Sequence, residues 1–202
     1  GSAAAVNAIF RDRRFGREPV TPPPVPPHLA PFYAVEAHSM LELEPPRHTR
    51  LRNLVLRAFT SRRIAALEPE IAALATELVE AFPSGDFDLL QAFAQPLPVR
   101  IIARLLGVPE EIAPDLLRWS NAMVGMYMAG RTPEMEAKAV AATEAFVTFL
   151  RGYVDQRRAR PADDLITQLI AAEMEGEKLS TDELISTCIL LLNAGHEATV
   201  HT

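Results

Sequence analysis

Five consecutive residues, Gly195–Thr199, combine a glycine, a histidine, an acid and a hydroxyl in the sequence GHEAT. They follow an apolar run from Leu184 to Leu192, which is typical of a helix buried on most sides. A buried carboxylate such as that of Glu197 needs either a charged partner or a task in proton transfer. Thr199 can simply donate its hydroxyl to a carbonyl one turn back. The pattern leaves both roles of Glu197 open.

A zinc site at this place is excluded by spacing. His196, Glu197 and His201 come close to the zinc-protease signature, in which two histidines lie four residues apart on one helix face. Here they are at i and i+5, so that their side chains diverge by about 140° on a regular helix. We therefore predict no metal ligands in this chain.

A second group of residues is basic, and no acid interrupts it between Pro45 and Leu67. Its members are Arg47, His48, Arg50, Arg52, Arg57, Arg62 and Arg63. His48 and Arg52 are one helical turn apart and project from one face. Together they suit an anionic oxygen group, because arginine grips a carboxylate with two donors and histidine adds a third. The alternative is a solvated basic face that pairs with neighbouring acids.

Two other features favour packing. Cys188 lies among Ile189, Leu190 and Leu191 with no base beside it in sequence, which predicts a buried and unreactive thiol. An apolar stripe is formed by Trp119, Met123, Met126 and Met128. It is either ordinary core or a wall of an apolar substrate pocket.

The composition bounds the class of protein. The chain has 202 residues, of which 49% are hydrophobic and 23% charged, and its net charge is −6. That acidity argues against nucleic acid as a partner. A single cysteine excludes an internal disulfide and is consistent with a cytoplasmic location, and no signal peptide or membrane-spanning run is visible. We expect no membrane partner.

The elements that must position these residues are mainly helices, with little β structure. Ser180 and Glu183 form a capping box that begins the apolar helix. Small residues at 194, 195 and 198 imply that something flat, or another helix, lies close to it. The proline-rich segment Glu18–Pro31 is not expected to be helical, and Phe87–Leu89 is expected to be a brief strand. Helices are expected at 3–14, 47–59, 61–82, 97–106, 109–128, 132–158, 162–175 and 180–202.

Taken together, three segments resemble the cytochrome P-450 family of haem-thiolate monooxygenases in its soluble bacterial form. VNAIFRDRRFGRE resembles the family's B helix, and LEPPRHTRLRNLVLRAFTSRRI its C helix and the entry to D. LLLNAGHEATV resembles the middle of the I helix. The resemblance implies one partial domain over 1–202, from the B helix to mid I helix, with a B–C loop at 18–46 and a truncated I helix at 180–202.

The resemblance also implies roles for residues. His48 and Arg52 would hold the propionates of haem b, and Ala194, Gly195 and Ala198 would line the cofactor and leave room for O2. Glu197 would belong to an acid–alcohol pair that supplies protons. The usual alcohol is replaced by Ala198, so that ordered water, a substrate hydroxyl or a shifted Thr199 must serve.

The implied activity is insertion of one atom of O2 into an apolar small molecule. The substrate walls are expected at Phe32, Tyr33, Val35, Met123 and Met126. A ferredoxin or flavodoxin is the expected electron donor, docking on Arg57, Arg62 and Arg63 because opposite surface potentials speed encounter.

The sequence also departs from the family pattern. The cysteine that ligates the iron, the Glu-x-x-Arg pair of a later helix and the N-terminal sheet are not found in it. We therefore expect an engineered piece, a proteolysed chain or a gene fragment, inactive by itself. The rival interpretation is a non-enzymatic helical fragment that binds an apolar ligand or a partner.

Overall fold

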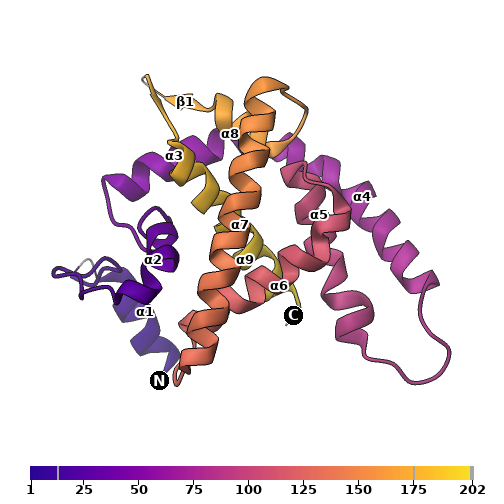
Figure 1. Cartoon of the computed structure of the whole chain (residues 1–202), viewed down its shortest axis with the longest axis horizontal. Coiled ribbons are helices and arrows are strands. Elements are labelled where there is room, and N and C mark those ends of the chain that lie inside the picture. The colour runs from indigo at the N-terminus through magenta and orange to yellow at the C-terminus, as the bar shows by residue number, and fades with distance from the viewer. Residues whose placement is uncertain (13, 175, 201–202) are drawn as a thin grey trace.

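The computed structural model describes residues 1–12, 14–174 and 176–200, with the side chains of residues 61–63 also outside the description. The fold is helical, and the described strands form one two-stranded hairpin (Figure 1). The longer helices are α1 Ala3–Arg11, α3 Arg47–Ala58, α4 Ser61–Glu80, α5 Pro96–Leu106, α6 Ala113–Val124, α7 Pro133–Ala159 and α9 Thr181–Val200. The shorter elements are η1 Pro27–Leu29, α2 Ala30–Glu36, η2 Leu90–Ala94, η3 Glu110–Ile112, η4 Gly125–Tyr127, α8 Leu165–Ala171, β1 Glu173–Met174 and β2 Glu177–Lys178.

Helix α9 is the element around which the others pack. The predicted capping box is confirmed: Ser180 N donates to Glu183 Oε2 at 2.8 Å, and Glu183 N donates to Ser180 Oγ at 3.2 Å. Each of these bonds satisfies a backbone donor that the helix itself leaves unpaired. From Leu184 to Ile189 every side chain is buried. Helices α2, α5, α6, α7 and α8 all contact α9, and α7 crosses in front of it in Figure 1.

The first half of α9 is thus the buried helix that its apolar run predicts. Cys188 is fully buried, and burial raises the pKa of its thiol to about 12. A thiol with so high a pKa stays protonated, which agrees with the predicted unreactive cysteine.

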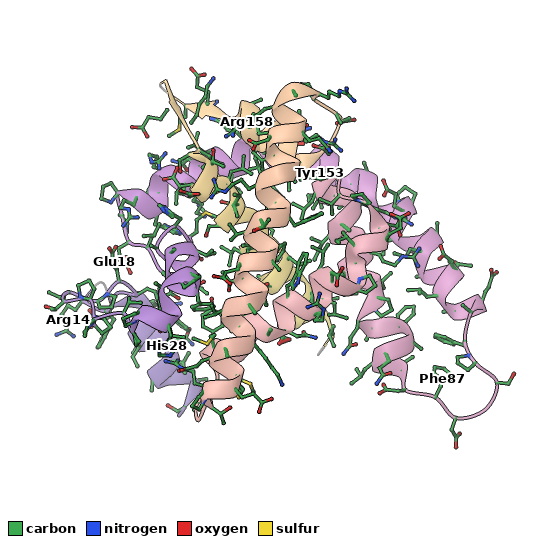
Figure 2. All side chains as sticks on the ribbon, viewed as in Figure 1. Arg14, Glu18, His28, Phe87, Tyr153 and Arg158 are labelled. Carbon is green, nitrogen blue, oxygen red and sulfur yellow. The ribbon has the colours of Figure 1, made fainter. Side chains whose placement is uncertain are left out.

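Several expected boundaries are wrong, each for a local reason. Phe87–Leu89 forms no strand; Phe87 lies on the loop after α4, and its ring packs 4.7 Å from that of Phe82 (Figure 2). The segment Glu18–Pro31 is not wholly extended, because η1 and α2 begin inside it. Proline is tolerated in a first turn, where its missing N–H has no helical partner. The B–C loop expected at 18–46 therefore contains a helix.

Three other helices differ in extent. The segment expected as one helix at 109–128 contains α6 with a short 3₁₀ turn before it and another after it. In the segment expected as a helix from residue 162, helix α8 covers only Leu165–Ala171, and strand β1 follows it. Helix α4, expected to reach residue 82, ends at Glu80. The expected end of the last helix at Thr202 lies outside the described residues.

An ion pair between the partly buried Arg157 and the buried Asp164 joins α7, α8 and the end of α5. Arg157 Nε donates to Asp164, whose Oδ1 caps α8 by accepting from Thr167 N at 2.8 Å. Arg157 also donates to the Gly107 carbonyl at 3.0 Å and to the hydroxyl of Tyr153, labelled on α7 in Figure 2, at 2.8 Å. Gly107 ends α5 with φ +84°, and a Cβ there would lie 2.3 Å from Asp164.

We predict that Gly107→Ala lowers the free energy of unfolding by roughly 3 kcal/mol or more, because the methyl group strains the left-handed backbone and pushes Asp164 away from Arg157. Gly130→Ala is the matched control. Its φ is +77° but a Cβ would meet no atom within 4 Å, so it should lose only about 1 kcal/mol. Urea unfolding measures both. Equal losses would show that the contact with Asp164 is unimportant.

Candidate functional site

A cavity of about 210 Å³ lies between α2, α9 and the end of α6 with η4. Its wall is largely aliphatic, and Glu36 contributes a carboxyl group to it. The lining residues are Val35, Glu36, Ser39, Leu41, Val124, Tyr127, Ser186, Ile189, Leu190, Asn193 and Ala194. Two residues predicted to lie at a site, Val35 and Ala194, therefore meet here although they are far apart in the sequence.

Glu36 is an unusual group for such a place. Only 8% of its surface is exposed, and its Oε2 accepts a hydrogen bond of 2.8 Å from the Tyr127 hydroxyl. Burial raises the pKa of the Glu36 carboxyl to about 7, and the nearby charge of Glu42 adds to this, while the Tyr127 hydrogen bond and Arg17 act in the opposite direction. Burial also raises the pKa of Tyr127, which therefore remains a donor. Glu36 can thus change its charge near neutral pH.

Sequence reasoning missed Glu36 and Tyr127. The two residues are 91 positions apart, and no spacing rule connects α2 with η4. The available signal was an acid in the apolar segment APFYAVE, where a charged residue lies within about a turn of Phe32 and Val35.

The small residues in the second half of α9 lie on two different sides of the helix. A Cβ on Gly195 would lie 2.9 Å from Ile102 Cδ1, so helix α5 occupies that side. Ala194 and Ala198 are exposed on another side. The predicted close approach is therefore made by a helix at Gly195, whereas the alanines leave an open surface.

The polar residues of this half-helix differ in burial. His196 is buried, and its Nδ1 lies 3.2 Å from Ser120 Oγ of α6. Glu197 is half-buried. Thr199 donates its hydroxyl to the Gly195 carbonyl at 2.7 Å, which is the local bond that its sequence context allows.

The basic side chains of α3 fall into two groups. Arg50 binds Glu183 of α9, and Arg47 donates to the Ala37 carbonyl at 2.9 Å. Within the described part of the chain, the side chains of His48 and Arg52 have no hydrogen-bond or ion-pair partner, and Arg52 is exposed. The alternative of a basic face paired with acids is thus correct for Arg50, and for Arg47, which lies 3.8 Å from Glu18 Oε1, but not for His48 or Arg52.

Helix α3 does not bring this basic pair to Gly195. Its ion pair with α9 is at Glu183. Glu183 precedes Ala194 by about three helical turns, or about 16 Å along the helix axis. Arg57 is exposed, whereas the side chains of Arg62 and Arg63 lie outside the described residues. A single ligand would have to be long or broad to meet both α3 and the alanine face.

The other expected substrate residues are not among those that line the cavity. Phe32 is 2% exposed and its ring contacts that of Tyr127 edge-on, with centroids 6.3 Å apart. Tyr33 packs edge-on against Phe32 at 5.4 Å. Met123 and Met126 are buried in the core rather than in the cavity wall. These four residues therefore belong to the packing around the cavity and not to its lining.

Two kinds of site are not formed by the described residues. No set of three histidine, cysteine or acidic side chains is grouped closely enough there to hold a metal ion. Among the helices described, none is both long and apolar enough to cross a membrane.

Comparison with curated proteins gives relatives at 36–41% identity, whereas no protein-family model matches the chain. Cytochrome P450 107B1 of Saccharopolyspora erythraea is 40% identical over 163 residues, covering 80% of this chain and 38% of its own length. The cytochrome P450 monooxygenase PikC of Streptomyces venezuelae is 36% identical over 201 residues, covering 96% of this chain and 45% of its own.

Solved structures give the same result. The chain matches P450BioI, crystallised with an acyl carrier protein carrying hexadec-9Z-enoic acid, with a TM-score of 0.88 and 29% identity over 98% of this chain. It matches the P450 MycG, bound to mycinamicin IV, with a TM-score of 0.75 and 36% identity. This chain spans 38–45% of the two curated relatives and about half of these solved chains.

We predict that the free energy of unfolding depends on pH through Glu36. Because its folded pKa is raised from 4.5 to about 7, the stability that Glu36 contributes is full below 4.5, falls as the pH rises, and is lost above 7. Glu36→Gln should therefore gain stability relative to the parent by roughly 3 kcal/mol between about pH 4.5 and pH 8.

Urea unfolding at a series of pH values measures this difference. The control is Glu80→Gln at the exposed end of α4, which should follow the parent throughout. A constant difference between Glu36→Gln and the parent would contradict the assigned titration.

Proposed function

Because the chain belongs to the cytochrome P450 family of haem monooxygenases, we propose that it works as the substrate-facing part of an oxygenase that inserts one atom of O2 into an apolar small molecule. The observation that carries this proposal is the open alanine face of α9 beside an aliphatic cavity. A flat cofactor on the alanine face would lie next to a substrate held in that cavity, because Ala194 belongs to both.

The donors on α3 fit the acidic edge of haem b. Arg52 is exposed, His48 lies one turn before it, and neither side chain is engaged by the rest of the described chain. Two cationic or neutral N–H donors on one face suit two propionate groups. When bound, haem supplies the iron and the redox chemistry that activate oxygen.

The alanine face suits the broad apolar part of the same cofactor. Ala194 and Ala198 are both exposed. Residues at i and i+4 lie only about 40° apart around a helix axis, so the two methyl groups share one side of α9. They leave room that larger side chains would fill. Gly195 contributes to this space less directly, since α5 packs on its open side.

Glu197 is the residue that we assign to proton supply. It is half-buried next to the alanine face, and Ala198 has no hydroxyl to share the task. The Thr199 hydroxyl already donates to the Gly195 carbonyl, so its remaining capacity is as an acceptor. Glu197 would thus hold and release the proton, while Thr199 would position a water rather than donate to one.

The cavity is the proposed substrate pocket. Val35 forms part of its wall, Phe32, Met123 and Met126 belong to the buried core, and Tyr33 packs against that core. Arg57 is exposed and offers a cationic contact for an acidic ferredoxin or flavodoxin as electron donor.

We predict that, in the complete protein carrying this chain, Arg52→Ala lowers haem retention by roughly tenfold or more, because it removes a charged hydrogen bond to a propionate. Arg57→Ala is the control, since it removes an exposed arginine from the same helix. The ratio of haem absorbance to protein after gel filtration measures retention. Equal haem occupancy in both variants would contradict the propionate assignment, and no haem in the parent would favour a non-enzymatic helical fragment.

A further inference from the structure

The polar groups of the cavity have an unbalanced hydrogen-bonding capacity. Asn193 Oδ1 is buried and has no partner among the described residues. Glu36 accepts one hydrogen bond, from Tyr127 to Oε2. A buried acceptor without a donor costs about 1–3 kcal/mol, so the wall is complete only when a donor enters.

The hydroxyl groups of the wall do not supply that donor. Ser186 donates to the Val35 carbonyl at 2.9 Å, and the Tyr127 hydroxyl is already directed at Glu36. Ser39 Oγ accepts from Leu41 N at 3.3 Å, and neither Ser39 nor any other described group donates to Asn193 Oδ1. The need for a donor therefore falls on the ligand.

The charged residues of the lining lead to the same requirement for a donor. Glu36 is the one acid in the lining, and no lysine, arginine or histidine belongs to the lining that the structure describes. The nearest cation that influences Glu36 is Arg17, which is engaged by Glu42 with 3.1 Å between Arg17 Nε and Glu42 Oε1. An ionised Glu36 therefore lacks a matched cation of its own.

We propose that Glu36 and Asn193 form a recognition site for a protonated amine on an otherwise apolar substrate. The ammonium group would donate to both acceptors, and its charge would compensate the Glu36 carboxylate in a poorly hydrated wall. The aliphatic body would pack on Val124, Ile189 and Leu190. A ligand carboxylate would be repelled at the same place. This inference rests on the proposed function in one respect, namely that the cavity is where substrate binds.

Two probe molecules of nearly equal shape but different charge distinguish recognition of charge from recognition of shape. Cyclohexylammonium is cationic and has N–H donors for both acceptors, whereas cyclohexanol is neutral. We expect Glu36→Gln to weaken binding of the ammonium roughly tenfold or more and to leave the alcohol within about twofold. Calorimetric titration of the haem-loaded protein measures both affinities, and Glu80→Gln is the matched control.

The pH dependence gives a second readout. The ammonium needs the ionised carboxylate, so its affinity should rise as the pH passes through the Glu36 pKa of about 7, while the alcohol shows no such rise. Tyr127→Phe removes a hydrogen bond that lowers the Glu36 pKa, so that the midpoint of this rise should move to higher pH. A role of Tyr127 in packing alone would leave the midpoint unchanged.

The failures are distinguishable. Equal weakening of both probes by Glu36→Gln, or none, overturns amine recognition while the cavity remains the proposed substrate pocket. If neither probe binds the parent protein, the cavity is not a ligand site and this inference is overturned with it. Haem retention in Arg52→Ala and Arg57→Ala then tests the proposed function independently of the two probes.

Discussion

The rest of the structure depends on the burial of the first half of α9. Helices from both halves of the chain contact α9, and no position from Leu184 to Ile189 is left at the surface. The capping box satisfies backbone donors at the start of this helix, and Arg50 of α3 binds the Glu183 that forms it. One carboxylate therefore fixes both where α9 begins and how α3 is attached to it. Everything that α9 presents further along, including Asn193, Ala194 and Glu197, is positioned from that end.

Three acidic residues, Asp164, Glu183 and Glu36, differ in the groups that bind their carboxylates. Asp164 and Glu183 are held by arginines and by helix-capping bonds, so that each of their oxygens has a partner. Glu36 has a tyrosine in place of an arginine. Burial raises the pKa of its carboxyl to about 7, and the hydrogen bond from Tyr127 offsets this only in part. Glu36 therefore differs from the other two acids in having no cation bound to it. Asp164 is buried to a similar degree and remains structural.

Local signals were sufficient for much of the fold and for part of the site. The capping box, the buried run of α9 and the buried Cys188 follow from short-range patterns, and the resemblance to the family agrees with the curated relatives. The errors lie where long-range packing decides. Phe87–Leu89 forms no strand, and the ring of Phe87 packs on that of Phe82 instead. The cavity wall joins α2 to η4 and α9 across distances that no periodicity encodes.

Gly195 illustrates how one residue type can satisfy two constraints of different origin. The sequence left either a flat group or another helix as the reason for the glycine, and the structure places Ile102 of α5 against its open side. Ala194 and Ala198 face outward, at about 60–100° from Gly195 around the helix axis. Glycine thus lets α5 approach α9 closely, and this approach sets the depth at which the alanines lie. The open surface at the alanines on one side of α9 therefore depends on tight packing on the other side, so that enlarging residue 195 would act on that surface by displacing helix α5.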